Sequence, residues 1–241
     1  MGISKKKILI IVPAYNEEGN IKRTVEELAS LGEDYSILVV NDGSKDSTFE
    51  KAKQTEAIVA SLPYNLGIGG AVQTGFRYAR DKGYDIAVQF DGDGQHDASY
   101  ISKLLEPVIS GEADVCIGSR FLPPYSDYRS SFLRRIGINF FAHLISFLTS
   151  YKVTDPTSGF RAFNKRMIKI FAHYYPHDFP EPEAISVSSR YGMKLKEIPV
   201  KMRKRVSGSS SIRYLYTLYY MIKVTFAILL DKIKNKKGYL L

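Results

Sequence analysis

The sequence contains a single cysteine, no tryptophan and no long uncharged run of apolar residues. One cysteine excludes an intrachain disulfide and a zinc site built from cysteines. Cys116 lies in the apolar segment 114–118, where we expect a buried strand thiol. The first seven residues have neither the apolar stretch nor the cleavage site of a secretory signal peptide, and we therefore expect a cytoplasmic protein.

Two segments of the second half are apolar, but neither is typical of a membrane span. Residues 136–151 are too few and too often interrupted by Gly, Asn and Ser, and Lys223 divides residues 213–232. In the second segment, aromatic residues lie among Lys and Arg, which is typical of a helix in the membrane interface or docked on a membrane-anchoring partner. A core-packing helix followed by a solvated lysine tail is the alternative.

Most of the chain has no excess of basic over acidic residues. The formal net charge is +9, yet the first 193 residues carry −1 and the remainder carries +10. This distribution argues against a domain that coats nucleic acid, and the basic end lacks a recognition module. It favours a near-neutral globular domain, residues 1–212, followed by an amphipathic, basic helix and tail, residues 213–241, that seeks a polyanion.

Short apolar segments alternate with helical ones through the first half of the chain. Strands are predicted over 7–12, 37–40, 57–60 and 86–90, and helices over 20–31, 47–55, 70–82 and 99–109. This order is typical of an α/β fold with a mostly parallel central sheet and helices on both faces. Ligands of such sheets bind beyond the carboxyl ends of the strands. Polar residues follow three of the predicted strands, at 13–17, 41–44 and 91–95.

The segment 89–97 carries the strongest local signal. Asp91 and Asp93 stand two residues apart just after a predicted strand, where a turn can direct both carboxylates to one point. With Gln95 they form an oxygen-rich set suited to Mg²⁺ or Mn²⁺, which retains waters and binds substrate phosphate oxygens. An acidic turn without a metal is the alternative, and the spacing of an EF-hand calcium loop is absent.

Two further motifs follow the second and third predicted strands. Asp42 can accept hydrogen bonds from a ribose or a base, and Gly43 permits close approach of the backbone. Asp46 is expected to cap the next helix. The glycines between residues 65 and 75 lack the spacing and the position of a dinucleotide fingerprint, which argues against a Rossmann dehydrogenase and favours a helix packed closely on the sheet.

The ordered set of motifs resembles the family 2 glycosyltransferases with the GT-A fold. The segments that carry the resemblance are 11–18 (IVPAYNEE), 40–44 (VNDGS), 65–67 (NLG), the Asp91–Asp93 turn and 118–120 (GSR). Segments 155–161 (DPTSGFR), 197–200 (EIPV) and 205–210 (RVSGSS) are similar to those of the polyprenyl- and dolichyl-phosphate hexosyltransferases within that family. The resemblance covers residues 7 to about 212.

The resemblance implies a role for each matched residue. It implies a nucleotide site formed by Pro13, Ala14, Tyr15, Glu17, Asp42 and Asp91. It implies a metal and diphosphate set of Asp91, Asp93 and Gln95. It also implies that donor or acceptor phosphates are bound by Ser119, Arg120, Arg161 and Arg205, and the planar fork of arginine does match phosphate oxygens.

Two positions depart from the family pattern. Asn41 stands where the family often has the first of two aspartates, although Asp42 is retained. Ser211 stands where dolichyl-phosphate mannose synthases often have Lys, which weakens the case for GDP-mannose and leaves a UDP-sugar as the preferred donor.

The implied reaction moves a hexose from a nucleotide-sugar to a polyprenyl phosphate at the inner face of the membrane. Because a phosphate monoester is already an anionic nucleophile, the protein would position two polyanions and stabilise the departing diphosphate, with inversion at the anomeric carbon. The expected catalytic residues are Asp91, Asp93, Arg120, Arg205 and Glu183. Glu183 serves as a base if the acceptor is a sugar hydroxyl; otherwise it is a first-turn acid of a helix. His96 and His143 are expected to be structural.

Two other functions stay open at this point. One is a soluble family 2 transferase that adds a sugar to a glycan hydroxyl in cell-surface polysaccharide synthesis, with the basic tail binding a partner or a second copy. The other is a catalytically idle binding subunit, against which the retained aspartates and arginines argue. The charge of the acceptor distinguishes the first alternative from transfer to a lipid phosphate.

Overall fold

A seven-stranded sheet in the order β3-β2-β1-β4-β6-β5-β7 forms the centre of the computed structural model, which describes residues 6–125, 132–149, 151–177, 180–203 and 214–233. The strands are β1 (Ile8–Ala14), β2 (Tyr35–Asn41), β3 (Ile58–Ser61), β4 (Ile86–Gln89), β5 (Val115–Ser119), β6 (Arg161–Asn164) and β7 (Leu195–Pro199). Neighbouring strands are parallel, except that β6 runs antiparallel to both β4 and β5. The expected mostly parallel α/β sheet is confirmed.

Helices connect the strands and extend beyond the last of them. They are α1 (Ile21–Ala29), α2 (Thr48–Lys53), α3 (Gly67–Asp81), α4 (Ile101–Ile109), α5 (Phe132–Thr149), α6 (Lys165–His173), α7 (Pro180–Arg190) and α8 (Tyr214–Ile233), with a short 3₁₀ helix at Ala98–Tyr100. The four helices predicted in the first half correspond to α1–α4, with ends that differ by up to three residues. Local periodicity was therefore sufficient to predict them.

The sheet buries side chains on both of its faces. In β1, Leu9 and Ile11 contribute to one apolar core, shared with α3 and α6, whereas Ile10 and Val12 contribute to the other, shared with α1 and α4. This alternation is the period of a strand covered on both sides. Cys116 of β5 is fully buried, as expected, and burial raises the pKa of its thiol to about 12.

Helix α3 lies very close to the sheet. A Cβ atom added to Gly75 would stand 2.3 Å from Cγ2 of Ile11, so no larger residue fits there without movement of the helix. The glycine-rich segment is thus a helix packed closely on the sheet, as the sequence indicated.

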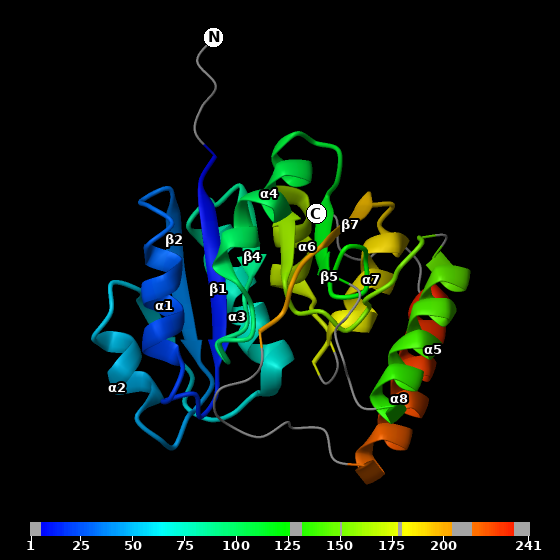
Figure 1. Cartoon of the computed structure of the whole chain (residues 1–241), viewed down its shortest axis with the longest axis horizontal. Coiled ribbons are helices and arrows are strands. Elements are labelled where there is room, and N and C mark those ends of the chain that lie inside the picture. The colour runs from blue at the N-terminus through cyan, green and yellow to red at the C-terminus, as the bar shows by residue number, and fades with distance from the viewer. Residues whose placement is uncertain (1–5, 126–131, 150, 178–179, 204–213, 234–241) are drawn as a thin grey trace.

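Helices α5 and α8 form one end of the molecule, opposite α1 and α2 (Figure 1). Helix α8 packs on α7 and α5, and buries Val224 and Ile228. Asp231 of α8 accepts a hydrogen bond from Ser186 at 2.9 Å and pairs with Arg190 at 3.1 Å, both in α7. In the part of the chain that the structure describes, no helix combines the length and apolarity needed to cross a membrane. The boundary expected at residue 212 lies outside the described residues.

The outer side of this end is apolar. Eight large apolar side chains of α5 and α8 are exposed, and we call them the α5–α8 apolar face: Ile136, Phe140, Phe147, Ile222, Phe226, Leu229, Leu230 and Ile233. They recur at the three- and four-residue spacing of one helix side. The C-terminal helix therefore uses one side to pack on the domain and leaves another apolar side open.

Candidate active site

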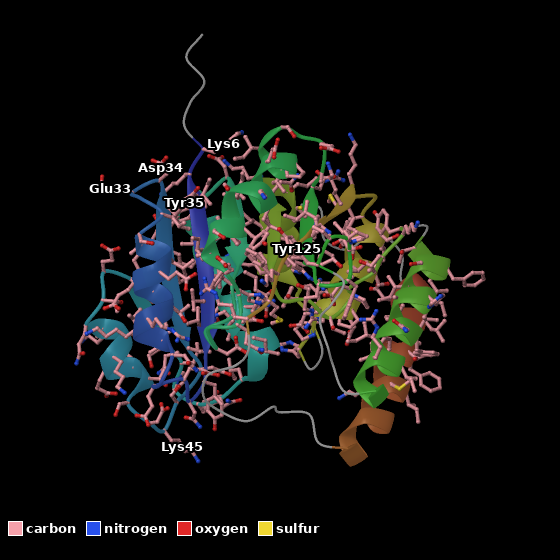
Figure 2. The ribbon with its side chains drawn as sticks, in the orientation of Figure 1. Lys6, Glu33, Asp34, Tyr35, Lys45 and Tyr125 are labelled. Carbon is pink, nitrogen blue, oxygen red and sulfur yellow. The ribbon has the colours of Figure 1, made fainter. Side chains whose placement is uncertain are left out.

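A cavity of about 670 Å³ opens where β1, β2 and β4 end. All eight residues that the sequence assigned to the nucleotide and the metal line it: Pro13, Ala14, Tyr15, Glu17, Asp42, Asp91, Asp93 and Gln95. A second hollow shares Tyr15 and Asn65 with this cavity and extends to Lys45. Figure 2 shows Lys45 at the end of the molecule opposite Glu33 and Asp34, which lie at the start of β2. Both hollows therefore lie at the carboxyl edge of the sheet, as predicted.

Asp42 directly follows β2 and is held by the loop after β3. Its Oδ1 accepts a hydrogen bond from the Leu66 amide at 2.7 Å, yet burial raises the pKa of the carboxyl above its usual value. Gly43 has a φ of 65°, and a Cβ there would approach the carbonyl carbon of Tyr64 to 2.6 Å. Asn41, one residue earlier, donates to Ser61 Oγ at 2.8 Å and so ties β2 to β3.

The turn after β4 places two carboxylates on the cavity wall. Asp93 accepts a hydrogen bond from the Gln95 amide at 3.0 Å, and His96 Nε2 lies 3.1 Å from Asp91 Oδ2. Burial alone would raise the pKa of Asp91, but the His96 hydrogen bond and charge lower it overall. A Cβ on Gly159 would stand 2.6 Å from Asp91 Oδ2, so this glycine forms the floor beneath the carboxylate.

The donor atoms of this turn fit a hard divalent cation. Asp91 and Asp93 supply carboxylate oxygens to the cavity, and within the described residues no cluster of three or more His, Cys, Asp and Glu side chains is arranged to hold a metal. Two carboxylates suit an ion such as Mg²⁺ or Mn²⁺, which takes its other ligands from water and substrate phosphate. They do not suit a structural zinc site, which takes four protein ligands.

Arg120 lines the cavity and forms an ion pair with the buried Asp155. Its Nε and Nη2 donate to the two carboxylate oxygens at 2.6 and 2.7 Å, and Nη2 also reaches Thr157 Oγ1 at 2.8 Å. Asp155 is fully buried; burial would raise its pKa, but the charge and hydrogen bonds of Arg120 lower it. The bidentate pair fixes the guanidinium plane and offsets its charge.

Ser119 lies behind the wall rather than on it. The side chain is fully buried, and its Oγ is 2.6 Å from Thr154 Oγ1. Glu197 of β7 accepts hydrogen bonds from the amides of Thr154 and Asp155 at 2.9–3.0 Å. This network positions the 154–155 backbone, and through Asp155 it positions Arg120.

Arg161 does not occupy the position that the sequence indicated. Its side chain is fully buried, and its three nitrogens donate to the carbonyls of Ser158 (2.7 Å), Glu181 (2.7 Å) and Pro156 (2.9 Å). Because these donors are used on the main chain and Arg161 is not among the residues that line the cavity, we propose a structural role for it in place of the expected contact with substrate phosphate. Arg205 lies outside the described residues.

Glu183 also lies away from the cavity. It borders a separate hollow between α7 and α8, whereas Glu181, two residues earlier, lines the cavity that holds Asp91. Burial raises the pKa of Glu181 to about 6, and the negative charge of Asp91 adds to this shift. Glu183 lies in the first turn of α7, as the alternative interpretation expected, and Glu181 is the carboxylate of this helix that reaches the cavity.

Several lining residues were not identified from the sequence as site residues: His96, Thr157, Gly159, Glu181 and Met202. His96 was expected to be structural, and its bond to Asp91 shows that it supports the site. Thr157 and Gly159 belong to segment 155–161, whose motif signalled importance without indicating which side chains face the cavity. No local signal distinguishes Met202.

The sequence matches the family described as Glycosyl transferase family 2 over residues 9–171. The chain belongs to this family. It is 33% identical over 218 residues to the UDP-N-acetylglucosamine–dolichyl-phosphate N-acetylglucosaminyltransferase of Methanococcus voltae, covering 83% of this chain and 86% of that protein. It is 29% identical to the undecaprenyl-phosphate mannosyltransferase of Micrococcus luteus, covering 86% and 87%. The protein is thus a glycosyltransferase related to enzymes named for polyprenyl and dolichyl phosphates.

Solved structures of glycosyltransferases share the architecture of this one. The glucosyl-3-phosphoglycerate synthase of Mycobacterium tuberculosis, solved with Mn²⁺, UDP and glucosyl-3-phosphoglycerate, has a TM-score of 0.73 to this chain at 19% identity, covering 97% of this chain and 82% of that one. At that identity the likeness concerns the fold, and it confirms the expected GT-A type.

Proposed function

We propose that this glycosyltransferase moves a hexose from a nucleotide-sugar, preferably a UDP-sugar, to a polyprenyl phosphate at the cytoplasmic face of the membrane. The observation that carries the proposal is the convergence of the three strand ends and Arg120 in one cavity. Relatives of nearly full length that are named for dolichyl and undecaprenyl phosphate support the acceptor.

The donor would lie against the residues after β1 and β2. Pro13, Ala14, Tyr15, Glu17 and Asp42 line that side of the cavity. Asp42 has one carboxylate oxygen on the Leu66 amide, which leaves acceptor capacity for a ribose hydroxyl. The name of the Methanococcus voltae relative favours UDP, whereas that of the Micrococcus luteus relative keeps GDP-mannose as the alternative donor.

Asp91, Asp93 and Gln95 would hold a Mg²⁺ or Mn²⁺ ion beside the diphosphate. When bound, such an ion supplies positive charge that stabilises the departing nucleoside diphosphate. His96 keeps Asp91 in its charged form through the 3.1 Å contact, and Gly159 leaves room for that carboxylate. Arg120, fixed by Asp155, presents the edge of its guanidinium to the phosphates.

The acceptor phosphate needs no base, since it is an anionic nucleophile at neutral pH. The residues of the chain would align it opposite the leaving diphosphate and exclude water, which is consistent with a single displacement and inverted configuration. NMR of the glycolipid product tests this: a retained anomeric configuration would contradict it.

The α5–α8 apolar face would bring the cavity to the membrane surface. Its side chains are exposed, and Asp231, the one acid in the sequences of α5 and α8, is paired with Arg190. Apolar and basic helices without free acids suit an anionic bilayer surface. The same face, which is followed in the sequence by the basic residues 232–237, also suits a membrane-anchoring partner or a second copy, which liposome binding by the purified chain would distinguish.

Transfer to a glycan hydroxyl is the second candidate, and Glu181 is the observation that favours it. A carboxylate with a pKa of about 6 inside the cavity is largely ionised at pH 7 and can remove a proton from a sugar hydroxyl. No such base is needed for a phosphate acceptor.

Donor and acceptor assays separate the two candidates. Thermal shift with UDP- and GDP-sugars, each with and without Mn²⁺, identifies the nucleotide, because a bound ligand stabilises the fold. Transfer to a short-chain prenyl phosphate that persists in Glu181→Gln supports the lipid acceptor. Transfer only to sugar hydroxyls, lost in Glu181→Gln, supports the glycan acceptor instead.

A further inference from the structure

Arg203 follows the cavity-lining residue Met202 but makes its contacts elsewhere. Its Nη1 lies 2.6 Å from Glu27 Oε2 of α1, and its Nη2 lies 3.2 Å from Asp97 Oδ1. Arg203 is not among the described residues that line the cavity. Its position close to Arg205 in the sequence suggests a phosphate contact, yet its guanidinium joins two carboxylates of the protein.

The main chain of Arg203 is tied to the same turn. Its amide donates to the Gln95 carbonyl at 2.8 Å, and the Gln95 side-chain amide lies 3.4 Å from the Arg203 carbonyl. Glu27 also accepts a hydrogen bond from the Ala98 amide at 3.0 Å. Helix α1, the turn 91–97 and the segment 201–203 are therefore joined at one place, which we call the Arg203 clasp.

The turn that the clasp holds needs external restraint. It contains Gly92 and Gly94, and Gly94 has a φ of 72°. Glycine has the largest freedom in the backbone, so such a turn is not fixed by its own conformational preferences. Its cavity-facing side chains, Asp91, Asp93 and Gln95, must nevertheless keep one geometry to bind a cation and a diphosphate.

The clasp also places Met202. The Met202 sulfur lies 3.8 Å from Nη1 of Arg120, and both residues line the cavity. The clasp thus joins the carboxylate turn to the segment whose Met202 contacts Arg120.

We propose that Arg203 is a positioning residue for donor binding, which holds the Asp91–Gln95 turn against α1 and the Met202 segment. The inference rests on the proposed function, since it concerns the same turn. Loss of the clasp would weaken binding of the nucleotide together with its cation. Global stability would change little, because the Arg203 side chain is 45% exposed and ion pairs of this kind contribute little to folding.

The test compares Arg203→Ala with a matched control, Lys196→Ala. Lys196 of β7 pairs with Glu112 at 2.6 Å and is 42% exposed, but it does not touch the turn. Hydrogen exchange of the ligand-free protein should be about tenfold faster at residues 91–97 in Arg203→Ala only. Calorimetry with UDP and Mn²⁺ should show about tenfold weaker binding in Arg203→Ala and an intermediate value in Arg203→Lys, because an ammonium cannot span both carboxylates as the planar fork does.

The outcomes separate this inference from the proposed function. Unchanged exchange at 91–97 in Arg203→Ala, or UDP affinity within about twofold of the wild type, would overturn it. Faster exchange throughout the chain, β5 included, would make Arg203 a general structural residue and also overturn it. A third outcome combines two results: exchange is faster only at 91–97 in Arg203→Ala, and the wild type binds neither UDP nor GDP with Mn²⁺. It would support the hold of Arg203 on the turn and refute the proposed donor.

Discussion

The cavity and the α5–α8 apolar face have opposite chemistry. The described cavity wall carries five carboxylates (Glu17, Asp42, Asp91, Asp93 and Glu181) and one arginine, whose charge Asp155 offsets. The face carries eight exposed apolar side chains on helices with one acidic residue. A nucleoside diphosphate should be repelled by the first region unless a cation enters with it. The helices of the second region have four basic residues and one acid in their sequences, which should attract an anionic bilayer. The two regions should therefore respond to different additives.

The largest effect should come from removing one carboxylate of the turn. Asp93→Ala is expected to lower the transfer rate on the order of 10³-fold, because charge on the leaving diphosphate is no longer stabilised. Mn²⁺-dependent thermal stabilisation by the donor should disappear as well. Binding to anionic liposomes should not change, and a parallel loss of liposome binding would mean that the two regions do not act separately.

A double substitution on the α5–α8 apolar face should have the reverse pattern. Phe147 and Phe226 are 84% and 61% exposed, and replacing both by Asp should weaken partition into anionic liposomes on the order of 10²-fold, since each aromatic contributes roughly 1.5–3 kcal/mol when buried. Affinity for the donor should be unchanged. Ile58→Asp with Ile109→Asp is the control, because these side chains are exposed on other elements.

Substitution of Arg161 tests whether this residue contributes to donor binding or only to the stability of the fold. Arg161→Met removes the donors to three main-chain carbonyls, two of them in buried contacts, and we expect a loss of about 2–3 kcal/mol in the free energy of unfolding by urea. The folded variant should bind the donor with wild-type affinity. Weaker donor binding at unchanged stability would return Arg161 to the phosphate site.

The smallest effect is expected in the pH dependence of the free energy of unfolding, to which Glu181 contributes. Its pKa in the fold is raised from 4.5 to about 6, so its contribution is fully present below pH 4.5 and is lost as the pH rises through 6. The change is about 2 kcal/mol at 1.36 kcal/mol per pH unit. Subtracting the stability curve of Glu181→Gln from that of the wild type isolates it, because Asp91 and Asp155, with lowered pKa values, contribute the opposite slope in both proteins. A difference curve that is flat between pH 4 and 7 would contradict the burial of this carboxyl.

The parts of the site that follow strand ends were predictable from the sequence. The strands were visible as short apolar runs, and Asp42, Asp91 and Asp93 follow them within a few residues. Because parallel strands present their carboxyl ends at one edge, local information was enough to bring these residues together.

The remaining site residues depend on contacts that a local pattern does not contain. Glu181 and Glu183 both lie in the first turn of α7, where residues two apart point in directions about 200° apart. Only one of the two therefore faces the cavity, and which one depends on how α7 packs on the rest of the fold. Arg161 was assigned by its chemical type, but its carbonyl partners come from tertiary packing, one of them from α7.

The contact of Gly159 with Asp91 has a consequence for synthesis of the chain. The residues against which we place the nucleotide leave the ribosome first, but the floor under Asp91 and the carboxyl of Glu181 are made much later. Translation proceeds at about 5–20 residues per second, so a nascent chain has the sheet edge for several seconds without a closed cavity. A closed cavity therefore requires synthesis to proceed beyond Glu181.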